Sequence, residues 1–420
     1  MDKSIQKYLS KQYLAHFIPQ YNNHKAFVII PVYQDFMIFN TLKSINETIT
    51  PSKINPAIII VVNHPENSPD KVVKKNKIIF DKLNTLTLNY PLYVLTAYDI
   101  RKKEAGVGFA RKVGMDTASY YFFQNNISDG LLISLDADTL VAQNYFVTIE
   151  KHFFTYQECR GISLYYEHLF LNNDLINKAI SQYELYLRYY VTMLRHIDFP
   201  FAFHTIGSAF VVRYQDYILQ GGMPKKQGGE DFYFLNKIML GGNYCDLTST
   251  TVYPSARPTQ KTPFGTGKTI YTLTKSPDSH LKTYNTEAFY LLKSVFENHI
   301  KLFETKDCEN YINNNIENKK VNEFLSGIEF CKHINLILQN TKNKKTFRKA
   351  FFTWFNGFKA VKLLNFLHTD NYLHKMDIEK AAFYITHFSG VSQQLDIMRG
   401  KDKTKSLYLT DNLNLETIQK

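Results

Sequence analysis

The stretch LLISLDAD, residues 131–138, is a run of mostly apolar residues that ends at two closely spaced carboxylates. Similar apolar runs occur at residues 26–30, 57–62 and 92–95. Continuous runs of Val, Ile and Leu are typical of strands that are covered on both faces, as in parallel sheets. Segments with helical periodicity alternate with these runs over residues 36–49, 70–87 and 104–122. This alternation predicts an α/β fold built on a doubly wound, mostly parallel sheet.

Polar residues follow three of these four runs: Tyr33-Gln34-Asp35, Asn63-His64 and Asp136-Ala137-Asp138. In doubly wound sheets, ligands bind outside the carboxyl ends of the strands. Two carboxylates one residue apart can both reach a hard divalent cation that also bridges phosphate oxygens. Asp136 and Asp138 are therefore candidate metal ligands.

Length, composition and charge limit the class of protein. The chain has 420 residues, and its 44% hydrophobic content excludes a disordered or fibrous protein. A formal charge of +12 fits nucleic acid, an anionic membrane or a phosphorylated substrate as partner. Residues 276–420 hold 21 basic and 16 acidic side chains, so the surplus is spread along the chain. Such a spread favours a cationic surround for an anionic diphosphate.

The cysteines and the chain's first residues bear on location. The four cysteines are far apart in sequence: Cys159, Cys245, Cys308 and Cys331. Because they form no CxxC pair, neither a zinc site nor a disulfide framework is indicated, and we expect reduced core thiols. Residues 1–24 lack the apolar stretch of a signal peptide, and no run approaches the ~18 apolar residues of a membrane span. These features predict a cytoplasmic protein. Separately, apolar residues recur at helical spacing over residues 5–18, which predicts an amphipathic helix there.

A second acidic pair, Glu230-Asp231, follows two glycines that permit close backbone approach. The segment from there to Met239 has helical periodicity, so both carboxylates are expected at the start of a helix. Simple capping of that helix is the alternative to a functional role.

Two further segments join glycine to positive charge. In residues 106–116, glycines precede a helix that carries Arg111 and Lys112, a combination that can bind a diphosphate through backbone N–H groups and charge. In residues 257–269, a loop carries Arg257 and Lys268, which could close over the same diphosphate. A P-loop is excluded, because Thr262 stands where its first glycine is required.

These segments, taken together, resemble the family-2 glycosyltransferases of GT-A fold. The resemblance covers roughly residues 25–270 and rests on five ordered motifs: KAFVIIPVYQD (25–35), GVGFARKVGMD (106–116), LLISLDADTLVAQNYF (131–146), TIGSAFVVR (205–213) and QGGMPKKQGGEDFYFLNKI (220–238). It implies transfer of a sugar from a nucleotide-diphospho-sugar, UDP-linked in our interpretation, to a hydroxyl acceptor. Synthesis of surface polysaccharide or another glycan is the implied setting.

The resemblance also implies roles for individual residues. Asp136 and Asp138 match the D-x-D pair that engages the donor and Mn²⁺ or Mg²⁺, and Asp231 matches the catalytic base, with Glu230 beside it on the acceptor side. The donor would be bound by the following residues: Pro31, Tyr33, Asn63, Gly108, Arg111, Lys112, Asp136, Arg257 and Lys268. An inverting transfer needs a carboxylate that takes the acceptor proton, and departure of the diphosphate needs charge neutralisation.

The sequence departs from the family pattern at two points. Asn63-His64-Pro65 stands where many members carry an Asp pair, which leaves the nucleotide open. The segment around Glu230 also resembles polypeptide N-acetylgalactosaminyltransferases, which retain configuration and carry Gly-Gly-Glu-Asn there; Asp231 at that place favours inversion. We interpret His204 and His280 as structural rather than as a third metal ligand.

The expected domains are an N-terminal helix (1–24), a catalytic GT-A domain (25–275) and a helical region (276–420). Within the last, residues 342–358 combine lysines with an aromatic helical face, and this face either contacts an anionic membrane or packs on the protein. Helices are expected over 283–303, 321–340, 346–367 and 376–398, followed by a loosely ordered tail. Two alternatives remain: an idle GT-A-like protein that binds nucleotide sugar, and a basic protein of the membrane periphery. Nucleic acid is disfavoured, because no RRM, KH, zinc or helix-turn-helix signature is present.

Overall fold

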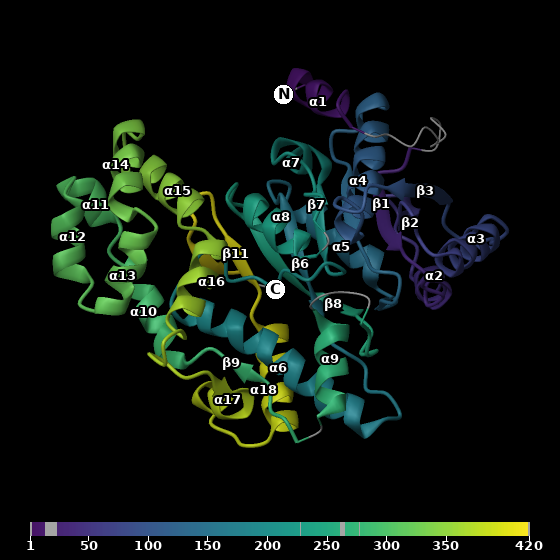
Figure 1. Ribbon diagram of the computed structural model, residues 1–420. Coiled ribbons are helices and arrows are strands. Elements are labelled where there is room, and N and C mark those ends of the chain that lie inside the picture. Colours follow the sequence, from purple (N-terminus) through teal and green to yellow (C-terminus); the bar gives the residue numbers. More distant parts are fainter. Residues whose placement is uncertain (1, 13–22, 227, 261–264, 277, 419–420) are drawn as a thin grey trace.

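A ten-stranded mixed sheet forms the centre of the molecule (Figure 1). This computed structural model describes residues 2–12, 23–226, 228–260, 265–276 and 278–418. The sheet strands are β1 (Ala26–Val32), β2 (Pro56–Pro65), β3 (Leu92–Ile100), β4 (Leu131–Ser134), β5 (Leu140–Val141), β6 (Gly161–Tyr166), β7 (Phe210–Arg213), β8 (Tyr244–Tyr253), β11 (Leu407–Leu409) and β12 (Leu415–Thr417). Their order is β12-β11-β8-β6-β7-β4-β1-β2-β3, with β5 beside β8. A separate pair is formed by β9 (Lys282–Thr283) and β10 (Met376–Asp377).

Most strands of the sheet run in one direction. β1 is parallel to β2 and β4, β2 is parallel to β3, and β6 is parallel to β8. β7 is antiparallel to both of its neighbours, and β5 and β11 are antiparallel to β8. The predicted α/β class with a mostly parallel central sheet is therefore confirmed.

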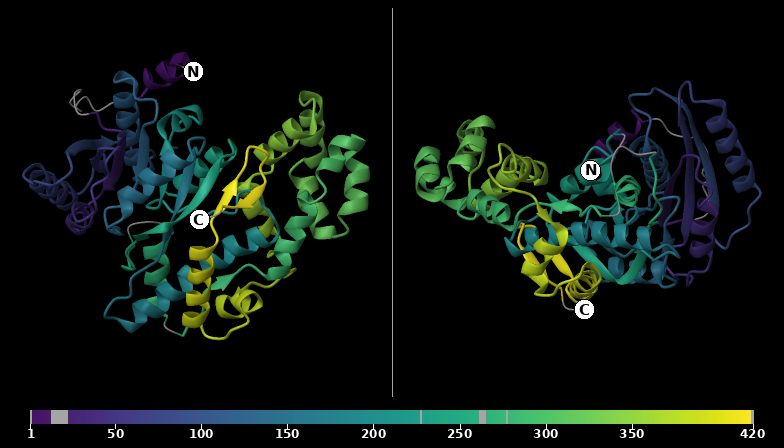
Figure 2. Two further views of the ribbon diagram at one scale, coloured as in Figure 1. Left: turned by 180° about the vertical axis from the view of Figure 1, so that it is seen from behind. Right: turned by 60° about the horizontal axis from the view of Figure 1, so that its bottom comes forward.

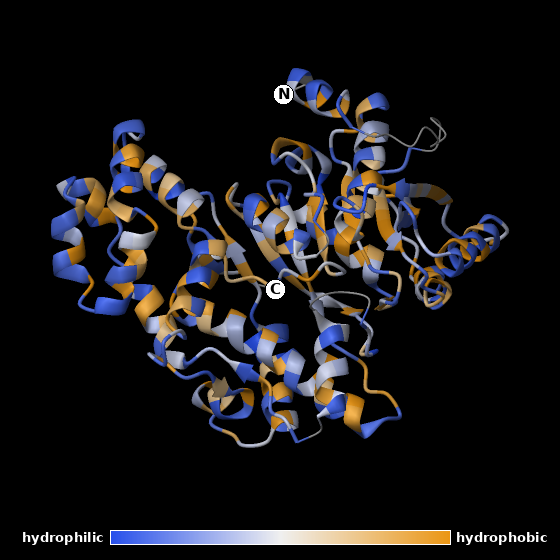
Figure 3. Cartoon of the chain, viewed as in Figure 1, coloured by the Kyte–Doolittle hydropathy of each residue, from blue (hydrophilic) through white to orange (hydrophobic). Residues whose placement is uncertain are grey.

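Helices cover both faces of this sheet. Those that precede β9 in the chain are α1 (Asp2–Leu9), α2 (Ile38–Asn46), α3 (Asp70–Asn84), α4 (Val107–Gln124), α5 (Tyr145–Thr155), α6 (Asp174–His196), α7 (Tyr214–Leu219), α8 (Glu230–Met239) and α9 (Thr266–Lys275). Alternate residues of β1 enter two different apolar cores: Phe27 packs in the core that includes Ala110 of α4, and Val28 packs in the one that includes Leu42 of α2. In Figure 3 the apolar colour accordingly gathers in β1 and its neighbours. The sheet is doubly wound, as predicted.

The C-terminal region is mostly helical and lies at the opposite end of the molecule from α2 and α3 (Figures 1 and 2). Its helices are α10 (Thr286–Phe296), α11 (Ile300–Thr305), α12 (Cys308–Asn315), α13 (Lys319–Gly327), α14 (Phe330–Asn340), α15 (Lys344–Trp354), α16 (Gly357–Phe366), α17 (Ile378–Thr386) and α18 (Val391–Thr404). Each of the four expected helical segments divides into two helices. The periodicity persists across the breaks because both helices of a pair bury an apolar face.

The end of the chain differs from the expectation of a loose tail. Residues 407–409 form β11, which pairs with Tyr244 and Cys245 at the start of β8, and β12 pairs with β11 in turn. The left view of Figure 2 shows these strands in yellow along the sheet. At the other end, α1 stops at Leu9, and residues 13–18 of the expected helix lie outside the described residues.

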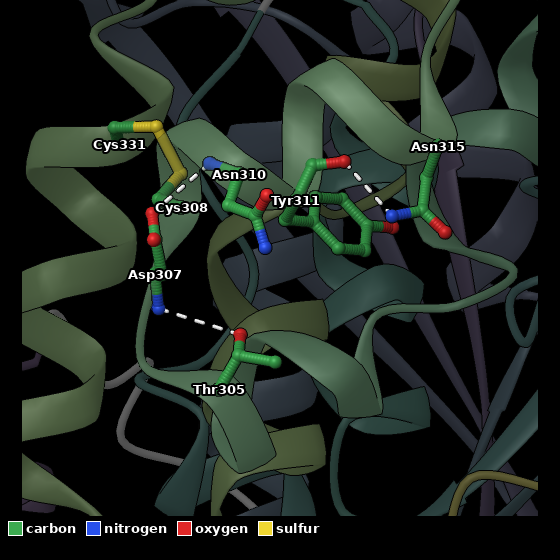
Figure 4. The surroundings of a disulfide bond; sticks show 7 residues. All are labelled: Thr305, Asp307, Cys308, Asn310, Tyr311, Asn315 and Cys331. Carbon is green, nitrogen blue, oxygen red and sulfur yellow. Dashed lines mark hydrogen bonds between the residues drawn. A yellow bond between two sulfur atoms is a disulfide. The ribbon is translucent and has the colours of Figure 1, made fainter.

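The helical region overturns a second expectation. Cys308 at the start of α12 is bonded to Cys331 of α14, although we expected both to be reduced (Figure 4). The two cysteines are 23 residues apart in sequence, so their spacing did not indicate a disulfide; the packing of α12 on α14 brings them together. Because disulfides persist in oxidising compartments, the cysteines no longer support a reducing one. Cys159 and Cys245 are free and buried, as expected.

Most of the aromatic face of residues 342–358 packs inside the protein, although Phe358 at its end is 37% exposed. Phe347 and Phe351 of α15 are fully buried and contact rings of the neighbouring helices, among them Phe303 and Phe330. The packing alternative is therefore favoured over a free membrane face, while Lys344 and the other lysines at the start of α15 stay exposed. Separately, no helix within the described ranges is both long and apolar enough to cross a bilayer.

Candidate functional site

Carboxylates from distant parts of the chain meet at the carboxyl end of β4. Asp136 lies two residues beyond β4, which ends at Ser134. Glu230 and Asp231 begin α8, whose preceding residue Gly229 has a left-handed backbone (φ 69°). This end of the strand is where a doubly wound sheet binds its ligand. The structure thus brings together both of the acidic pairs that the sequence singled out.

Arg111 joins the two acidic pairs. Its guanidinium donates a hydrogen bond of 2.6 Å from Nη2 to Oδ1 of Asp136, and a second from Nη1 to Oε1 of Glu230. The Arg111 and Glu230 side chains are 1% and 3% exposed, whereas Asp136 is 38% exposed. Arg111 therefore lies beneath the carboxylates and holds them in place, instead of lying at the surface where a diphosphate would meet it.

Asp231 lies beside this buried arginine. Its Oδ1 accepts a hydrogen bond of 2.7 Å from the N–H of Phe232. A Cβ at Gly207 would stand 3.1 Å from both Oδ2 of Asp231 and Nη2 of Arg111, so a side chain there would crowd the pair. Ser134, the last residue of β4, fixes Gly207 by donating a 2.7 Å hydrogen bond to its carbonyl.

The electrostatics of Asp231 suit a proton acceptor. Burial, together with the charge of Glu230, raises the pKa of Asp231 to about 7, although Arg111 opposes this shift. A carboxyl group with a pKa near neutrality is partly ionised at the pH at which it would work, which is the condition for effective general-base catalysis. Perturbed carboxyl groups of this kind concentrate at functional sites.

Arg257 organises a second carboxylate group next to the first. It donates a 2.8 Å hydrogen bond to Oδ2 of Asp138 and two further ones to Asp35, which follows β1. Burial and the neighbouring charge of Asp136 raise the pKa of Asp138 to about 6, and Arg257 opposes the shift. Asp35, Asp136 and Asp138 thus line one stretch of the strand ends, and a guanidinium balances two of them.

The oxygen donors present here fit a hard divalent cation. Asp136 and Asp138 stay 38% and 30% exposed, so both can be reached from solvent. Among the described residues these carboxylates do not form a compact three-ligand group. Mg²⁺ and its relatives are commonly held by one or two carboxylates plus substrate phosphates, which matches a pair of this kind.

Other predicted donor residues lie apart from these carboxylates. Lys112 points to the far side of α4, where its ammonium pairs with Asp116 at 3.0 Å and donates to Tyr8 of α1 at 2.7 Å. Lys268 lies in the first turns of α9 with its ammonium near the ring of Tyr271. Neither of these contacts connects its lysine to the acidic cluster. Residues 261–264 of the expected 257–269 loop lie outside the described residues.

The remaining predicted residues take positions set by the backbone. Pro31 is buried inside β1, and Tyr33 follows the strand end, half-buried. Asn63 is buried within β2 and donates its amide to the carbonyl of Val32 at 3.0 Å, which orients it toward the backbone. Gly108 lies against the 224–226 backbone, where a Cβ would stand 2.6 Å from the carbonyl oxygen of Lys226.

Four more residues bear on the site: the histidines His204 and His280, which we expected to be structural, and Asp35 and Gly207, which the sequence did not mark as site residues. The buried His204 faces Asp402 at 3.4 Å, which agrees with a structural role. His280 is exposed. Asp35 was noted only as a polar strand end, and Gly207 only as part of a motif; their proximity to Arg257 and Asp231 depends on long-range packing.

A separate cavity of about 1180 Å³ lies between α6, α10, α17 and α18. Its lining is rich in cations, including Arg195, Lys375, Lys401 and Lys405, and contains none of the predicted site residues that the structure describes. Arg195 lies twelve residues beyond Tyr183 on α6, about 18 Å at the rise of a helix. Burial raises the pKa of Tyr183 to about 12, and the charges of Tyr186 and Asp231 add to this shift, so Tyr183 lies on the side of α6 nearer Asp231.

The whole chain is similar to solved structures but not, at the level of sequence, to known families. No family model matches the chain, and no curated protein matches its sequence. Among solved structures, residues 1–349 of TarS from S. aureus share 13% identity over 90% of this chain and 88% of that one, with a TM-score of 0.37. The same protein in complex with UDP-GlcNAc gives a TM-score of 0.38. The mannosyltransferase PcManGT from Pyrobaculum calidifontis, in complex with GDP-Man and Mn²⁺, shares 13% identity over 96% and 93% of the chains, with a TM-score of 0.33.

Proposed function

We propose that this protein is an inverting, metal-dependent glycosyltransferase. It would move a sugar from a nucleotide-diphospho-sugar, UDP-linked in the first instance, to the hydroxyl of a glycan or a similar acceptor. The observation that carries the proposal is the buried Arg111, which brings Asp136 of the D-x-D pair and the Glu230-Asp231 pair to one site. Simple capping of α8 does not account for this arrangement, because Glu230 pairs with Arg111 of α4.

Asp231 is the proposed catalytic base. Its carboxylate would take the proton of the acceptor hydroxyl as that oxygen attacks the anomeric carbon. Glu230 would not take part directly, since its oxygen already accepts from Arg111. Its charge instead contributes to the raised pKa of Asp231, which makes Asp231 a stronger base once it is ionised.

Asp136 and Asp138 are the proposed ligands of Mn²⁺ or Mg²⁺. When bound, such an ion neutralises the charge that develops on a departing diphosphate. Arg257 now balances Asp138 and Asp35. A donor diphosphate would compete with these carboxylates for the guanidinium, so Arg257 could bind the phosphates while Asp138 would be left to hold the cation.

The setting of the reaction is part of the proposal. We propose synthesis of a surface polysaccharide or another glycan at the inner face of the membrane. The cysteines do not support this cytoplasmic location, because Cys308 and Cys331 form a disulfide. Contact through residues 342–358 would rest on the exposed lysines of α15, because Phe347 and Phe351 are buried.

A donor screen tests the proposal directly. The full chain with Mn²⁺ is incubated with UDP- and GDP-sugars, beginning with UDP-GlcNAc and GDP-Man, and release of nucleoside diphosphate is measured. In parallel, UDP or GDP with Mn²⁺ should raise the melting temperature, and the variant Asp138→Asn should lose this shift.

Asp129→Asn is the matched control, because Asp129 pairs with Lys25 at the amino ends of β4 and β1, opposite the carboxyl ends where Asp136 and Asp138 lie. It should keep both the release and the shift. If UDP and GDP have no effect on the wild-type protein in the presence of Mn²⁺ or Mg²⁺, the proposal fails. If they bind but no sugar is released or transferred, the protein is an idle binder of nucleotide sugar.

A further inference from the structure

Two free cysteines and a histidine meet in the core on the side of the sheet that α5 covers. Cys159 precedes β6, Cys245 is the second residue of β8, and His152 lies in the last turns of α5. Each can offer a ligand atom, and these atoms all lie within 4.8 Å of one another. Both cysteines are completely buried, and His152 is 6% exposed.

This cluster is distinct from the proposed active site. β4, β6 and β8 run in the same direction, since β7 is antiparallel to both β4 and β6. Cys159 and Cys245 lie at the amino ends of β6 and β8, whereas Asp136 follows the carboxyl end of β4. The two sites therefore lie at opposite ends of the strands.

Packing alone leaves the histidine unexplained. Buried cysteines are common as small apolar residues, and Cys159 donates to the carbonyl of Gly161 at 3.3 Å. The Nε2 atom of His152, however, is buried and makes no hydrogen bond within the part of the chain that the structure describes, and the imidazole lies beside the thiol of Cys159. An unpartnered ring nitrogen inside a protein costs free energy, and metal coordination near two thiols is one way to recover it.

We propose that His152, Cys159 and Cys245 bind a zinc ion that ties α5 to β6 and β8. The Sγ atoms of Cys159 and Cys245 are 3.5 Å apart. Two thiolates on a tetrahedral zinc, at bonds of ~2.3 Å, are about 3.7 Å apart. The carbonyl oxygen of Gly161, 3.3 Å from Sγ of Cys159, is the nearby group that could complete a four-coordinate site.

The ligand set favours zinc over other metals. Two thiolates and a neutral imidazole around Zn²⁺ leave no net charge in the core, whereas Cu⁺ would leave one negative charge buried. Magnesium and calcium prefer oxygen ligands and are excluded by the sulfurs. On binding, Zn²⁺ replaces the two thiol protons, which are released to solvent.

Metal analysis and cobalt substitution of the full chain test the site. Protein from zinc-supplemented culture should contain about one zinc per chain after brief treatment with a weak chelator. With Co²⁺ in place of zinc, the wild-type protein should show thiolate-to-cobalt charge-transfer absorption. This absorption should disappear in Cys245→Ser and in His152→Gln, and it should persist in Asp138→Asn, which alters only the oxygen site.

His299→Gln is the matched control, because His299 is also buried with an unpartnered Nε2 but is surrounded by aromatic rings and not by cysteines. It should keep both the zinc and the absorption. The wild-type measurement needs no variant to fold. Absence of the charge-transfer band, a band that survives Cys245→Ser, or a Cys159–Cys245 disulfide in metal-free protein as isolated would each overturn the proposal.

Discussion

Arg111 on α4 and Glu230 at the start of α8 form an ion pair across 119 residues of sequence, with both side chains almost completely buried. A buried pair is strongly destabilised when one partner is removed, because the other charge then lacks compensation. The pair supports Asp136 on one side and Asp231 on the other. The positions of both proposed functional carboxylates therefore depend on one guanidinium.

Replacing Arg111 by methionine should destabilise the fold by about 3–5 kcal/mol, because Glu230 is left buried without its partner. Replacing Lys25 by methionine should cost less than about 1 kcal/mol, because its pair with Asp129 is partly exposed, at 31% and 44% for the two side chains. Urea denaturation at neutral pH measures both. Adding Glu230→Gln to Arg111→Met should recover part of the loss; a double variant no more stable than the single one would contradict the pairing.

Substituting Asp231 by asparagine should lower the transfer rate by about 10²–10⁴, while donor affinity stays unchanged. In the wild-type protein only the ionised carboxyl group can act as base. With a pKa of about 7, the rate should rise with pH by about tenfold between pH 6 and pH 8. Initial rates over this range check the effect, and unaltered transfer by the variant would remove Asp231 from the base role.

The same carboxyl group should affect stability in the opposite direction. Its pKa is raised in the folded protein, so the folded state binds its proton more tightly than the unfolded chain does. This contribution to stability is fully present below the pKa of the unfolded chain and is lost as the pH rises through 7. Asp231→Asn should therefore have a higher melting temperature than wild type at pH 8, and the difference should shrink toward pH 4.

Asp402 of α18 is the second buried charge on which the fold depends. It accepts from Arg188 and from Arg195 of α6 and faces His204. Burial alone would raise its pKa, but His204 and the two arginines hold it well below its usual range. Its contribution to stability is thus present above the ordinary pKa of about 3.9 and is lost as the pH falls below it.

Asp402→Asn should cost about 3–5 kcal/mol at neutral pH. The exposed Asp396 on the same helix provides the control, and Asp396→Asn should change the free energy of unfolding by less than about 0.5 kcal/mol. In thermal melts from pH 7 to pH 3, the difference in melting temperature between Asp402→Asn and Asp396→Asn should shrink as the pH falls. Equal stability of both variants at pH 7 would contradict the role of Asp402.

The bond between Cys308 and Cys331 should contribute about 2–4 kcal/mol to the free energy of unfolding of the helical region, because it restricts the conformational freedom of the unfolded chain between the two cysteines. Reductant should lower the melting temperature of the wild-type protein but not that of Cys308→Ser. A thiol count in denaturant provides the check: two free thiols are expected without reductant, and four would exclude the disulfide.

The elements set by local pattern were predictable from the sequence. The apolar runs of β1, β2 and β4 and the crossover helices between them follow from the period of their own residues. Pairing across long distances left no local signal: β11 joins β8 through Tyr408 and Cys245, and Cys308 meets Cys331.

The site shows the same division. The acidic pairs were recognisable because each stands next to a strand end or a glycine turn. The side-chain partners were not predictable, since Arg111 and its neighbour Lys112 look equivalent in sequence, yet Arg111 meets Asp136 while Lys112 meets Asp116 on another side of α4. Which of the two meets Asp136 depends on the angle at which the helix packs on the sheet, and no motif records that angle.

The joining of β11 to β8 has a consequence for how the chain matures during synthesis. Arg188 and Arg195 are in place on α6 long before residue 402 is translated, and their counter-charge on α18 comes with the strand that follows it. Domains generally fold from the N-terminal side as the ribosome proceeds, at ≈ 5–20 residues per second. Until residues 402–409 emerge, Arg188 and Arg195 would have only Glu184 and Asp246 as counter-charges, and β8 would lack the pairing that β11 provides. Ribosome-bound chains halted before that point should therefore remain sensitive to protease along α6.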